Sequence, residues 1–175
     1  MSEFPRELLT PRLRLRQWRD DDAVGLARIA QDPGYQAYMP PLDLSAARDL
    51  VARFRERWAE TGVCQWAAED LETGGFLGRI GILQHSDWPL EPLPSEVGWT
   101  LAPEARGRGL ASEGGRAAID AAFAHLAVDH VISITRPDNW PSRRVMERLG
   151  LTLRGTAYWR EHDSVWYAVD RTAWG

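Results

Sequence analysis

Apolar and polar residues repeat along this chain with two periods, one of two residues and one of three to four. The period of two is typical of a half-buried strand and runs through residues 9–16 as Leu-Thr-Pro-Arg-Leu-Arg-Leu-Arg. Two more strands are predicted at 64–68 and 76–83, and the polar, glycine-containing segment 70–75 between them favours a hairpin. The first half of the chain is therefore expected to supply antiparallel strands.

The longer period predicts helices. The acidic run at 20–22 is expected to cap a helix that ends near 32–34. Ser45 is a plausible N-cap of a second helix, in which Leu50, Val51, Phe54 and Trp58 share one face. A third helix is expected from about Ser112, with Ile119, Ala122, Phe123 and Leu126 on one face, and a short fourth one ends at Gly150.

In the second half, strands and helices alternate. The β-branched run at 131–135 predicts a strand covered on both faces, and 151–158 and 165–170 predict closing strands. Strands that come first as a meander and then alternate with helices predict a mixed sheet flanked by helices. The predicted fold class is α/β (α+β), in a single domain over 1–175 with its core at about 10–170.

Composition narrows the class of protein. A chain of 175 residues, 44% hydrophobic and 26% charged, suits one globular domain. No apolar run approaches the ~20 residues of a membrane span, and the first residues lack the regions of a signal peptide. We therefore expect no membrane partner. Cys64 is the only cysteine, so we expect a buried, inert thiol and a reducing, cytoplasmic compartment.

Charge narrows it further. The net charge of −4 argues mildly against a nucleic-acid partner. All 21 basic residues are arginine, so no lysine is present to form a Schiff base or to bind phosphate as an ammonium. No clustered histidine and cysteine spacing suggests a metal. A role in nucleic-acid binding through Arg106-Gly107-Arg108 stays a third, weaker alternative.

The most informative stretch is residues 96–111, Glu-Val-Gly-Trp-Thr-Leu-Ala-Pro-Glu-Ala-Arg-Gly-Arg-Gly-Leu-Ala. A β-prone run ends at Pro103, and a glycine-rich turn then leads into an alanine-rich helical pattern. A strand that enters such a turn at a helix N-terminus binds anions, because unpaired N–H groups and the helix dipole point at one spot. Glycine also lets the backbone approach a phosphate closely.

At these residues the chain resembles the GNAT acetyltransferases. Arg106-x-x-Gly109-x-Ala111 is similar to the pyrophosphate loop of that superfamily, Gln/Arg-x-x-Gly-x-Gly/Ala. The opening at 10–18, Thr-Pro-Arg-Leu-Arg-Leu-Arg-Gln-Trp, resembles the ribosomal-protein alanine N-acetyltransferase (RimJ/RimL-like) branch. The resemblance implies acetyl-CoA as co-substrate, held at its pyrophosphate by the loop, whose residues are Arg106, Gly107, Arg108, Gly109, Leu110, Ala111 and Ser112.

A second motif strengthens the resemblance. Asn139-x-x-Ser142 followed by Gly150-Leu151 is similar to the Asn-x-x-Ser/Ala…Gly-Phe segment of GNAT proteins, with leucine in place of phenylalanine. The family fold has a mostly antiparallel sheet of about seven strands, splayed between the fourth and fifth, with about four helices. The resemblance implies that the pantetheine arm enters this splay, beside the backbone of Trp99, Thr100 and Leu101 and opposite the amide of Asn139.

The resemblance also implies catalytic groups. Many members carry a tyrosine four residues beyond the Ser/Ala position to protonate the leaving thiolate, but Met146 stands there in this chain. Ser142 is then the remaining acid, as in the ribosomal-protein branch, although it is also placed to be a helix N-cap. Glu96 and Glu161 are the candidate bases, and the sequence does not choose between them. His85, on a proline-rich loop, is expected to be solvated.

The expected activity is direct transfer of an acetyl group to a primary amine, either a protein N-terminus or a small amine. Such a transfer needs no covalent enzyme intermediate, which agrees with the absence of a Cys-His pair or a Gly-x-Ser-x-Gly elbow. The alternative is a non-catalytic acyl-CoA-binding or sensing module, which would share the loop and Asn139. The sequence leaves the acceptor open, and it leaves open whether the protein is a monomer or a homodimer.

Overall fold

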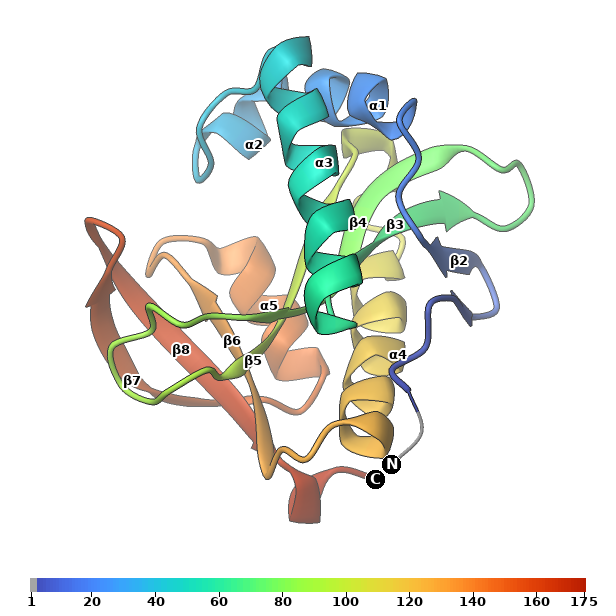
Figure 1. Ribbon diagram of the computed structural model, residues 1–175. Coiled ribbons are helices and arrows are strands. Elements are labelled where there is room, and N and C mark those ends of the chain that lie inside the picture. The colour runs from blue at the N-terminus through green and yellow to red at the C-terminus, as the bar shows by residue number, and fades with distance from the viewer. Residues whose placement is uncertain (1–2) are drawn as a thin grey trace.

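The computed structural model describes residues 3–175, so Met1 and Ser2, which belong to the predicted domain, lie outside the described residues. Among residues 3–175, eight strands form one sheet and five α-helices flank it (Figure 1). The strands are β1 (Leu8–Leu9), β2 (Leu13–Arg16), β3 (Gln65–Asp70), β4 (Phe76–Gln84), β5 (Ser95–Leu101), β6 (His130–Thr135), β7 (Thr152–Trp159) and β8 (His162–Asp170). The helices are α1 (Asp22–Ile29), α2 (Pro33–Gln36), α3 (Leu44–Thr61), α4 (Leu110–His125) and α5 (Trp140–Arg148).

The sheet order is β1-β2-β3-β4-β5-β6-β8-β7. All neighbouring strands run antiparallel except β5 and β6, which run parallel and pair only at Glu96 with Ile132. The predicted mixed, mostly antiparallel sheet is therefore confirmed. The two-residue β1 and the four-residue α2 account for the difference from about seven strands and four helices.

Helices cover both faces of the sheet, as consecutive residues of β4 show. An added Cβ on Gly114 of α4 would lie only 2.6 Å from Ile80 Cδ1, so α4 packs closely on one face. The guanidinium carbon of Arg79 lies 5.7 Å from the ring centroid of Phe54 in α3, so α3 covers the other face. Neighbouring residues of a strand point to opposite faces, which gives each helix its own side.

Three sequence-based boundaries are corrected. The strand predicted at 9–16 is a small hairpin, because Pro11 has no N–H for a ladder and Thr10 N donates to Leu13 O at 2.9 Å to form a turn. The N-cap of α3 is Asp43 and not Ser45, since the Asp43 side chain accepts from Ala46 N at 2.8 Å. The first helix was expected to end near 32–34, but α1 ends at Ile29, and the residues near 32–34 begin α2, with Asp32 as its N-cap.

A buried ion-pair network joins β2 to β3 and α1. Arg16 donates from Nε to Glu69 Oε2 at 2.6 Å and from Nη1 and Nη2 to both carboxylate oxygens of Asp22 at 2.9 Å. Burial acts to lower the pKa of Arg16, but the hydrogen bonds of Asp22 and Glu69 raise it above its usual value. All three side chains are buried, so each charge depends on its partners.

The core beneath α3 is rich in tryptophan. The indole N–H groups of Trp18 and Trp58 both donate to the backbone oxygen of Gln65, at 2.8 and 3.1 Å. Trp58 is 2% exposed and packs against Trp66, so it belongs to the core and does not line a pocket. Cys64 is fully buried, and burial raises the pKa of its thiol to about 11, which confirms an inert thiol.

Candidate active site

The glycine-rich turn leaves a run of backbone N–H groups without acceptors. Gly107 and Gly109 have φ of +72° and +79°, in the left-handed region where glycine is favoured. Arg106 N donates to Pro103 O at 3.2 Å and Glu113 N donates to Gly109 O at 3.0 Å. Between them, the N–H groups of residues 107–112 have no acceptor among residues 3–175. They gather at the N-terminus of α4, where the helix dipole is positive.

An orphaned hydroxyl lies at the same helix end. The Oγ atom of Ser112 is buried and has no hydrogen-bond partner within the described chain. An added Cβ on Gly107 would meet nothing within 4 Å, so the loop also has free space beside it. Unpaired donors and space for oxygen atoms are what a pyrophosphate requires, so these residues fit the group that the sequence predicts.

The side chain of Arg106 fastens the loop to other elements. Its Nε donates to Leu101 O at 3.1 Å, and its Nη1 lies 2.7 Å from Asp32 Oδ2 at the start of α2. The hydrogen bond from Arg106 lowers the pKa of Asp32. Arg106 is therefore partly committed to supporting the loop, and a direct contact with phosphate stays a prediction.

A second arginine, Arg12, supports the loop from the turn directly before β2. Arg12 donates from Nη1 to Arg108 O at 2.7 Å, and its other nitrogens bind Glu113 at 2.6 and 2.7 Å. The side chain of Arg108 is 46% exposed and lies 3.6 Å from Asp70. Leu110 is 1% exposed and Ala111 half-buried, so they anchor the first turn of α4 in the core.

The sheet opens between β5 and β6, directly before this loop. Ser133 Oγ donates to Val97 O at 2.8 Å, and beyond this bond β5 pairs with no strand on its β6 side among residues 3–175. Backbone direction alternates along a strand, so the N–H and C=O of Trp99 point into the opening, as the C=O of Val97 does. Thr100 points its backbone toward β4, where it pairs with Arg79, and Leu101 O is taken by Arg106.

Asn139 and Ser142 lie on the other side of the opening, at the start of α5. Asn139 is the N-cap, with Oδ1 accepting from Ser142 N at 3.3 Å and Nδ2 donating to Thr135 Oγ1 at 2.9 Å. The interpretation of Ser142 as N-cap is therefore wrong. Its hydroxyl has no hydrogen-bond partner among residues 3–175, and Met146 below it is 1% exposed.

Glu96 lies at the last rung between β5 and β6, paired with His85. Glu96 Oε2 is 2.6 Å from His85 Nε2, and Oε1 accepts from Ile134 N at 3.2 Å. Arg160 Nη2 lies 3.4 Å from His85 Nδ1. An arginine only donates, so His85 Nδ1 accepts and its Nε2–H donates to Glu96. His85 is 5% exposed, so the expectation of a solvated histidine is wrong.

Glu161 occupies a different position. It lies in the exposed turn between β7 and β8 with φ of +65° and lines a surface hollow of about 350 Å³ with Arg136 and Tyr158. The preceding residue, Arg160, reaches His85 and Asp87, so the turn stands beside the His85 loop. The two candidate bases therefore differ in burial: Glu96 lies largely buried at the rung between β5 and β6, and Glu161 lies on the surface.

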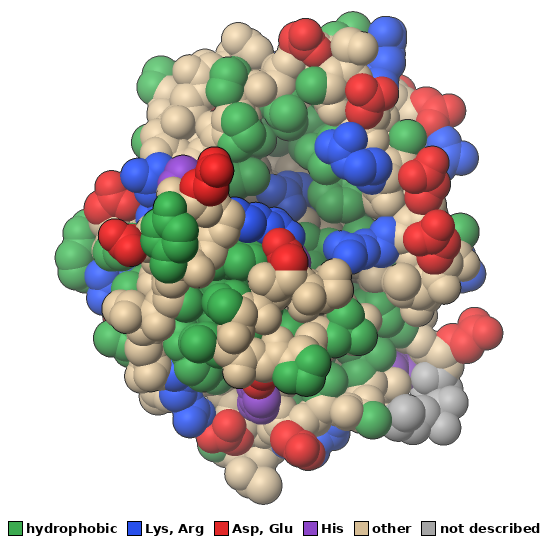
Figure 2. All heavy atoms as spheres, turned by 60° about the vertical axis from the view of Figure 1, so that its left-hand side comes forward, with side chains coloured by type: hydrophobic (Ala, Val, Ile, Leu, Met, Phe, Trp, Pro, Cys, Tyr) green, Lys and Arg blue, Asp and Glu red, His purple; other side chains and the backbone are tan. Residues whose placement is uncertain are grey.

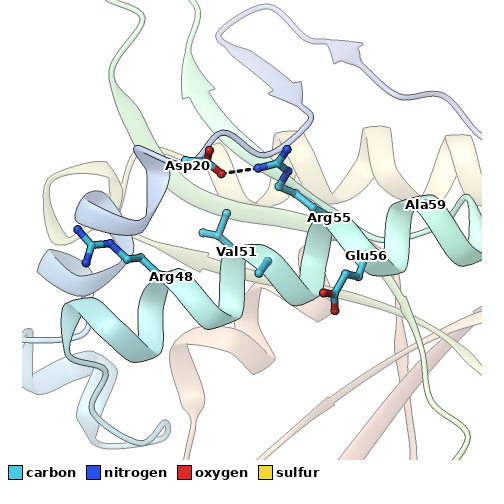
Figure 3. A pocket seen from close by; sticks show the side chains of 7 residues that line it. Asp20, Arg48, Val51, Arg55, Glu56 and Ala59 are labelled. Atoms are coloured by element: carbon cyan, nitrogen blue, oxygen red, sulfur yellow. Dashed lines mark hydrogen bonds and ion pairs between the residues drawn. The ribbon is translucent and has the colours of Figure 1, made fainter.

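Figures 2 and 3 each show a hollow of the surface. Figure 2 shows a hollow on the face turned toward the viewer, with arginine side chains at its floor and hydrophobic side chains around it. A second hollow of about 600 Å³ lies on the outer side of α3. There Asp20 and Arg55 point toward one another and form an ion pair (Figure 3). The outer hollow contains none of the predicted site residues.

Sequence reasoning missed the residues that act from neighbouring elements. The contacts of Arg12 with the loop, of Arg160 with His85 and of His85 with Glu96 join residues far apart in the sequence, so local patterns carry no signal for them. Arg79 had a signal, because it is the one charged residue in the otherwise apolar run of β4. Within residues 3–175, no helix is long and apolar enough to cross a membrane, and no cluster of His, Cys, Asp or Glu has metal-binding geometry.

A sheet that opens beside a glycine-rich loop with free N–H groups is the architecture of acyl-CoA-utilising transferases. Comparison with known protein families and solved structures places this chain among them. Residues 12–152 match the acetyltransferase (GNAT) domain family, and the chain belongs to that family. The Bacillus subtilis (strain 168) protein YkkB is 32% identical over 147 residues, 83% of this chain and 84% of that protein.

Solved structures agree on the fold. An acetyltransferase from Agrobacterium tumefaciens str. C58 superposes with a TM-score of 0.81 at 28% identity, over 98% of this chain and 97% of that one. Mycobacterium smegmatis RimJ, solved in complex with CoA-disulfide, superposes with a TM-score of 0.71 at 21% identity, over 91% of this chain and 82% of that one. The predicted RimJ/RimL-like architecture is thereby confirmed at the level of the fold.

Proposed function

We propose that this protein is an acetyl-CoA-dependent N-acetyltransferase that moves the acetyl group directly to a primary amine. The observation that carries the proposal is the run of N–H groups at 107–112 without acceptors, next to a sheet opened at Trp99. When bound, acetyl-CoA supplies an acyl group already activated as a thioester. The loop and the opening are the parts of this chain that hold the two ends of such a molecule.

The residues along the opening have separate tasks. The N–H of Trp99 points into the opening and is placed to donate to a carbonyl oxygen as negative charge develops on it. The free hydroxyl of Ser142 lies across from it and is the group that donates to the departing sulfur. The backbone of β5 is rigid because it is paired with β4 along its whole length, so these donors are positioned before the substrate binds.

Glu96 is the base that we propose. It stands at the closed end of the opening, and its side chain is 14% exposed, so it is reachable but largely shielded from water. His85 holds the Glu96 carboxylate in position and is itself held by Arg160. The proton that Glu96 takes from the amine then passes to water at the exposed part of its side chain. Glu161 remains the alternative base, and the comparison of Glu96→Gln with Glu161→Gln decides between them through the loss of kcat.

The test measures CoA-thiol release from acetyl-CoA with N-terminal peptides and small amines, and mass spectrometry identifies the products. Saturable CoA affinity without acetylated product would support the alternative of a non-catalytic acyl-CoA-binding module. Ser142→Ala is the sharp variant, because Asn139 and not Ser142 caps α5. We expect kcat to fall roughly 10²-fold with stability unchanged within about 0.5 kcal/mol.

Asn139→Ala is the matched control for helix capping. Removing this N-cap should cost about 1 kcal/mol of stability, which Ser142→Ala should not. Equal kcat for the wild type and Ser142→Ala, measured where chemistry limits turnover, would remove Ser142 from the mechanism.

A further inference from the structure

Arg79 is a cation on the face of the sheet that α3 covers. It lies in the middle of β4 and faces α3, where Phe54 lies under its guanidinium. Thr100 of β5 is its cross-strand partner, and Glu96 lies four residues along the same strand. Alternation places Glu96, Gly98 and Thr100 on the same face as Arg79. The residue is half-buried and thus retains some open surface.

Unlike the buried Arg16, Arg79 has no carboxylate partner within residues 3–175. No Asp or Glu oxygen lies within 4.0 Å of its nitrogens in the described part of the chain. Its single hydrogen bond goes from Nη1 to the side-chain oxygen of Gln65. A guanidinium has five N–H donors, so most of them have no acceptor in the protein. Arg16, which is more deeply buried, binds two carboxylates.

The surroundings of Arg79 favour an anion. Burial lowers the pKa of Arg79, although the charges of Tyr35, Glu96 and Cys64 act in the opposite direction. An arginine nevertheless stays charged in proteins, so the chain keeps a positive charge at a place where solvation is poor. A carboxylate that binds there replaces the solvation that the Arg79 guanidinium has lost, and it accepts two parallel hydrogen bonds from it.

Gln65 holds the guanidinium in position. Its backbone oxygen anchors the indoles of Trp18 and Trp58, so the residue is fixed from the core side. An added Cβ on Gly98 would lie 2.9 Å from Gln65 Nε2, which means that the amide lies directly over the middle of β5. The charge of Arg79 is therefore presented beside the strand along which the acyl group is expected.

We propose that the acceptor carries a carboxylate near its amine and that Arg79 binds this carboxylate while the amine reaches the opening beside Glu96. The proposal rests on the proposed function and names its substrate class. The Cα positions of Arg79 and Glu96 are separated by about four residues of strand, on the order of 13 Å, and both side chains are long enough to shorten that gap. An amine and a carboxylate a few bonds apart fit this spacing.

The carboxylate has two possible sources, which paired substrates separate. The first pair compares free alanine, glutamate and aspartate with the corresponding α-carboxamides. The second compares C-terminally amidated tripeptides that have Asp or Glu in the first two positions with those that have Asn or Gln. We expect the acid of at least one pair to be acetylated with a kcat/KM 10- to 100-fold higher than its amide, because hydrogen bonds to a charged partner are strong.

Variants assign that preference to Arg79. Arg79→Met should raise KM for the preferred acid by about the acid-over-amide ratio, roughly 10- to 100-fold, leave KM for its amide nearly unchanged, and leave acetyl-CoA affinity intact. Arg79→Lys should recover only part of the loss, because an ammonium lacks the planar pair of donors. Arg53→Met is the matched control, since Arg53 is exposed on α3, and it should change neither value.

The outcomes separate this inference from the proposed function. If amines are acetylated with equal efficiency as acids and amides, or if Arg79→Met leaves the preference in place, the Arg79 inference is refuted while the transferase activity stands. If no amine is acetylated, calorimetric titration of the protein–CoA complex with the same pairs replaces turnover. Tighter binding of an acid that Arg79→Met abolishes then supports the inference, and equal binding of acid and amide overturns it.

Discussion

Placing a negative charge at Gly109 tests the anion loop most directly. Gly109 has φ of +79°, so any substitution strains the backbone, but Asn and Asp tolerate this region better than other residues. Gly109→Asp and Gly109→Asn therefore carry nearly the same strain and nearly the same shape. An added Cβ meets only Arg12 Nη2, at 3.6 Å, so both variants fit without a clash. The difference between the two variants measures the charge alone.

The expected magnitude follows from Coulomb's law. At about 5 Å and an effective dielectric constant of ~20, one charge pair costs about 3 kcal/mol, which is on the order of 10²-fold in affinity. Arg12 does not cancel the new carboxylate, because Glu113 already binds it at 2.6 Å. Calorimetric titration should thus give a dissociation constant for acetyl-CoA at least 50-fold weaker, by this estimate, for Gly109→Asp than for Gly109→Asn, with the gap narrowing as salt is added.

Thermal unfolding of both variants provides the control, because equal midpoints show that the fold is equally intact. Equal affinity of Gly109→Asp and Gly109→Asn for acetyl-CoA would refute the assignment of residues 107–112 to the phosphates.

Two more predictions concern ion pairs. Asp22→Asn should lower the free energy of unfolding by about 3–5 kcal/mol in urea titrations, because it leaves Arg16 short of a buried partner, whereas the exposed Asp21→Asn should change it little. Equal midpoints for these two variants would contradict the role of the network. The lowered pKa of Asp32 means that its pair with Arg106 is complete above the ordinary carboxyl pKa and is lost only as pH falls through the lower folded value. Asp32 should therefore add no pH dependence to CoA affinity between pH 5 and 7, and Asp32→Asn should weaken this affinity at pH 7. An affinity that Asp32→Asn does not change would show that the pair does not hold the loop.

Local patterns were sufficient to predict much of the fold. The helix of α4 and the hairpin of β3 and β4 rest on periodicity and turn residues, which act within a few positions of the chain. The errors fall where side chains compete locally. The N-cap of α3 is Asp43, two residues before Ser45, and that of α5 is Asn139, three residues before Ser142. In both cases a carboxylate or amide oxygen accepts from the first turn of the helix in place of the serine hydroxyl.

The candidate site was predictable only where it is continuous in sequence. The loop at 107–112 follows from its glycines, and their positive φ angles are a local property. The pairing of His85 with Glu96 and the approach of Arg160 depend on how β5 and the β7–β8 turn come together, so no local pattern encodes them. Arg79 was visible as a charge inside an apolar strand, but its lack of a carboxylate is a property of the assembled fold.

The gap between β5 and β6 is an edge enclosed within a sheet. At an outer edge, free strand backbone recruits other chains and promotes aggregation. In this chain the bond between Ser133 and Val97 closes one end of the gap, and β5 and β6 flank it on both sides. Paired strands elsewhere in the sheet lie about 4.8 Å apart. A partner of the free backbone therefore enters along the strands, from the end at the loop. The same backbone groups that would promote aggregation at an outer edge are here enclosed between two strands of one sheet.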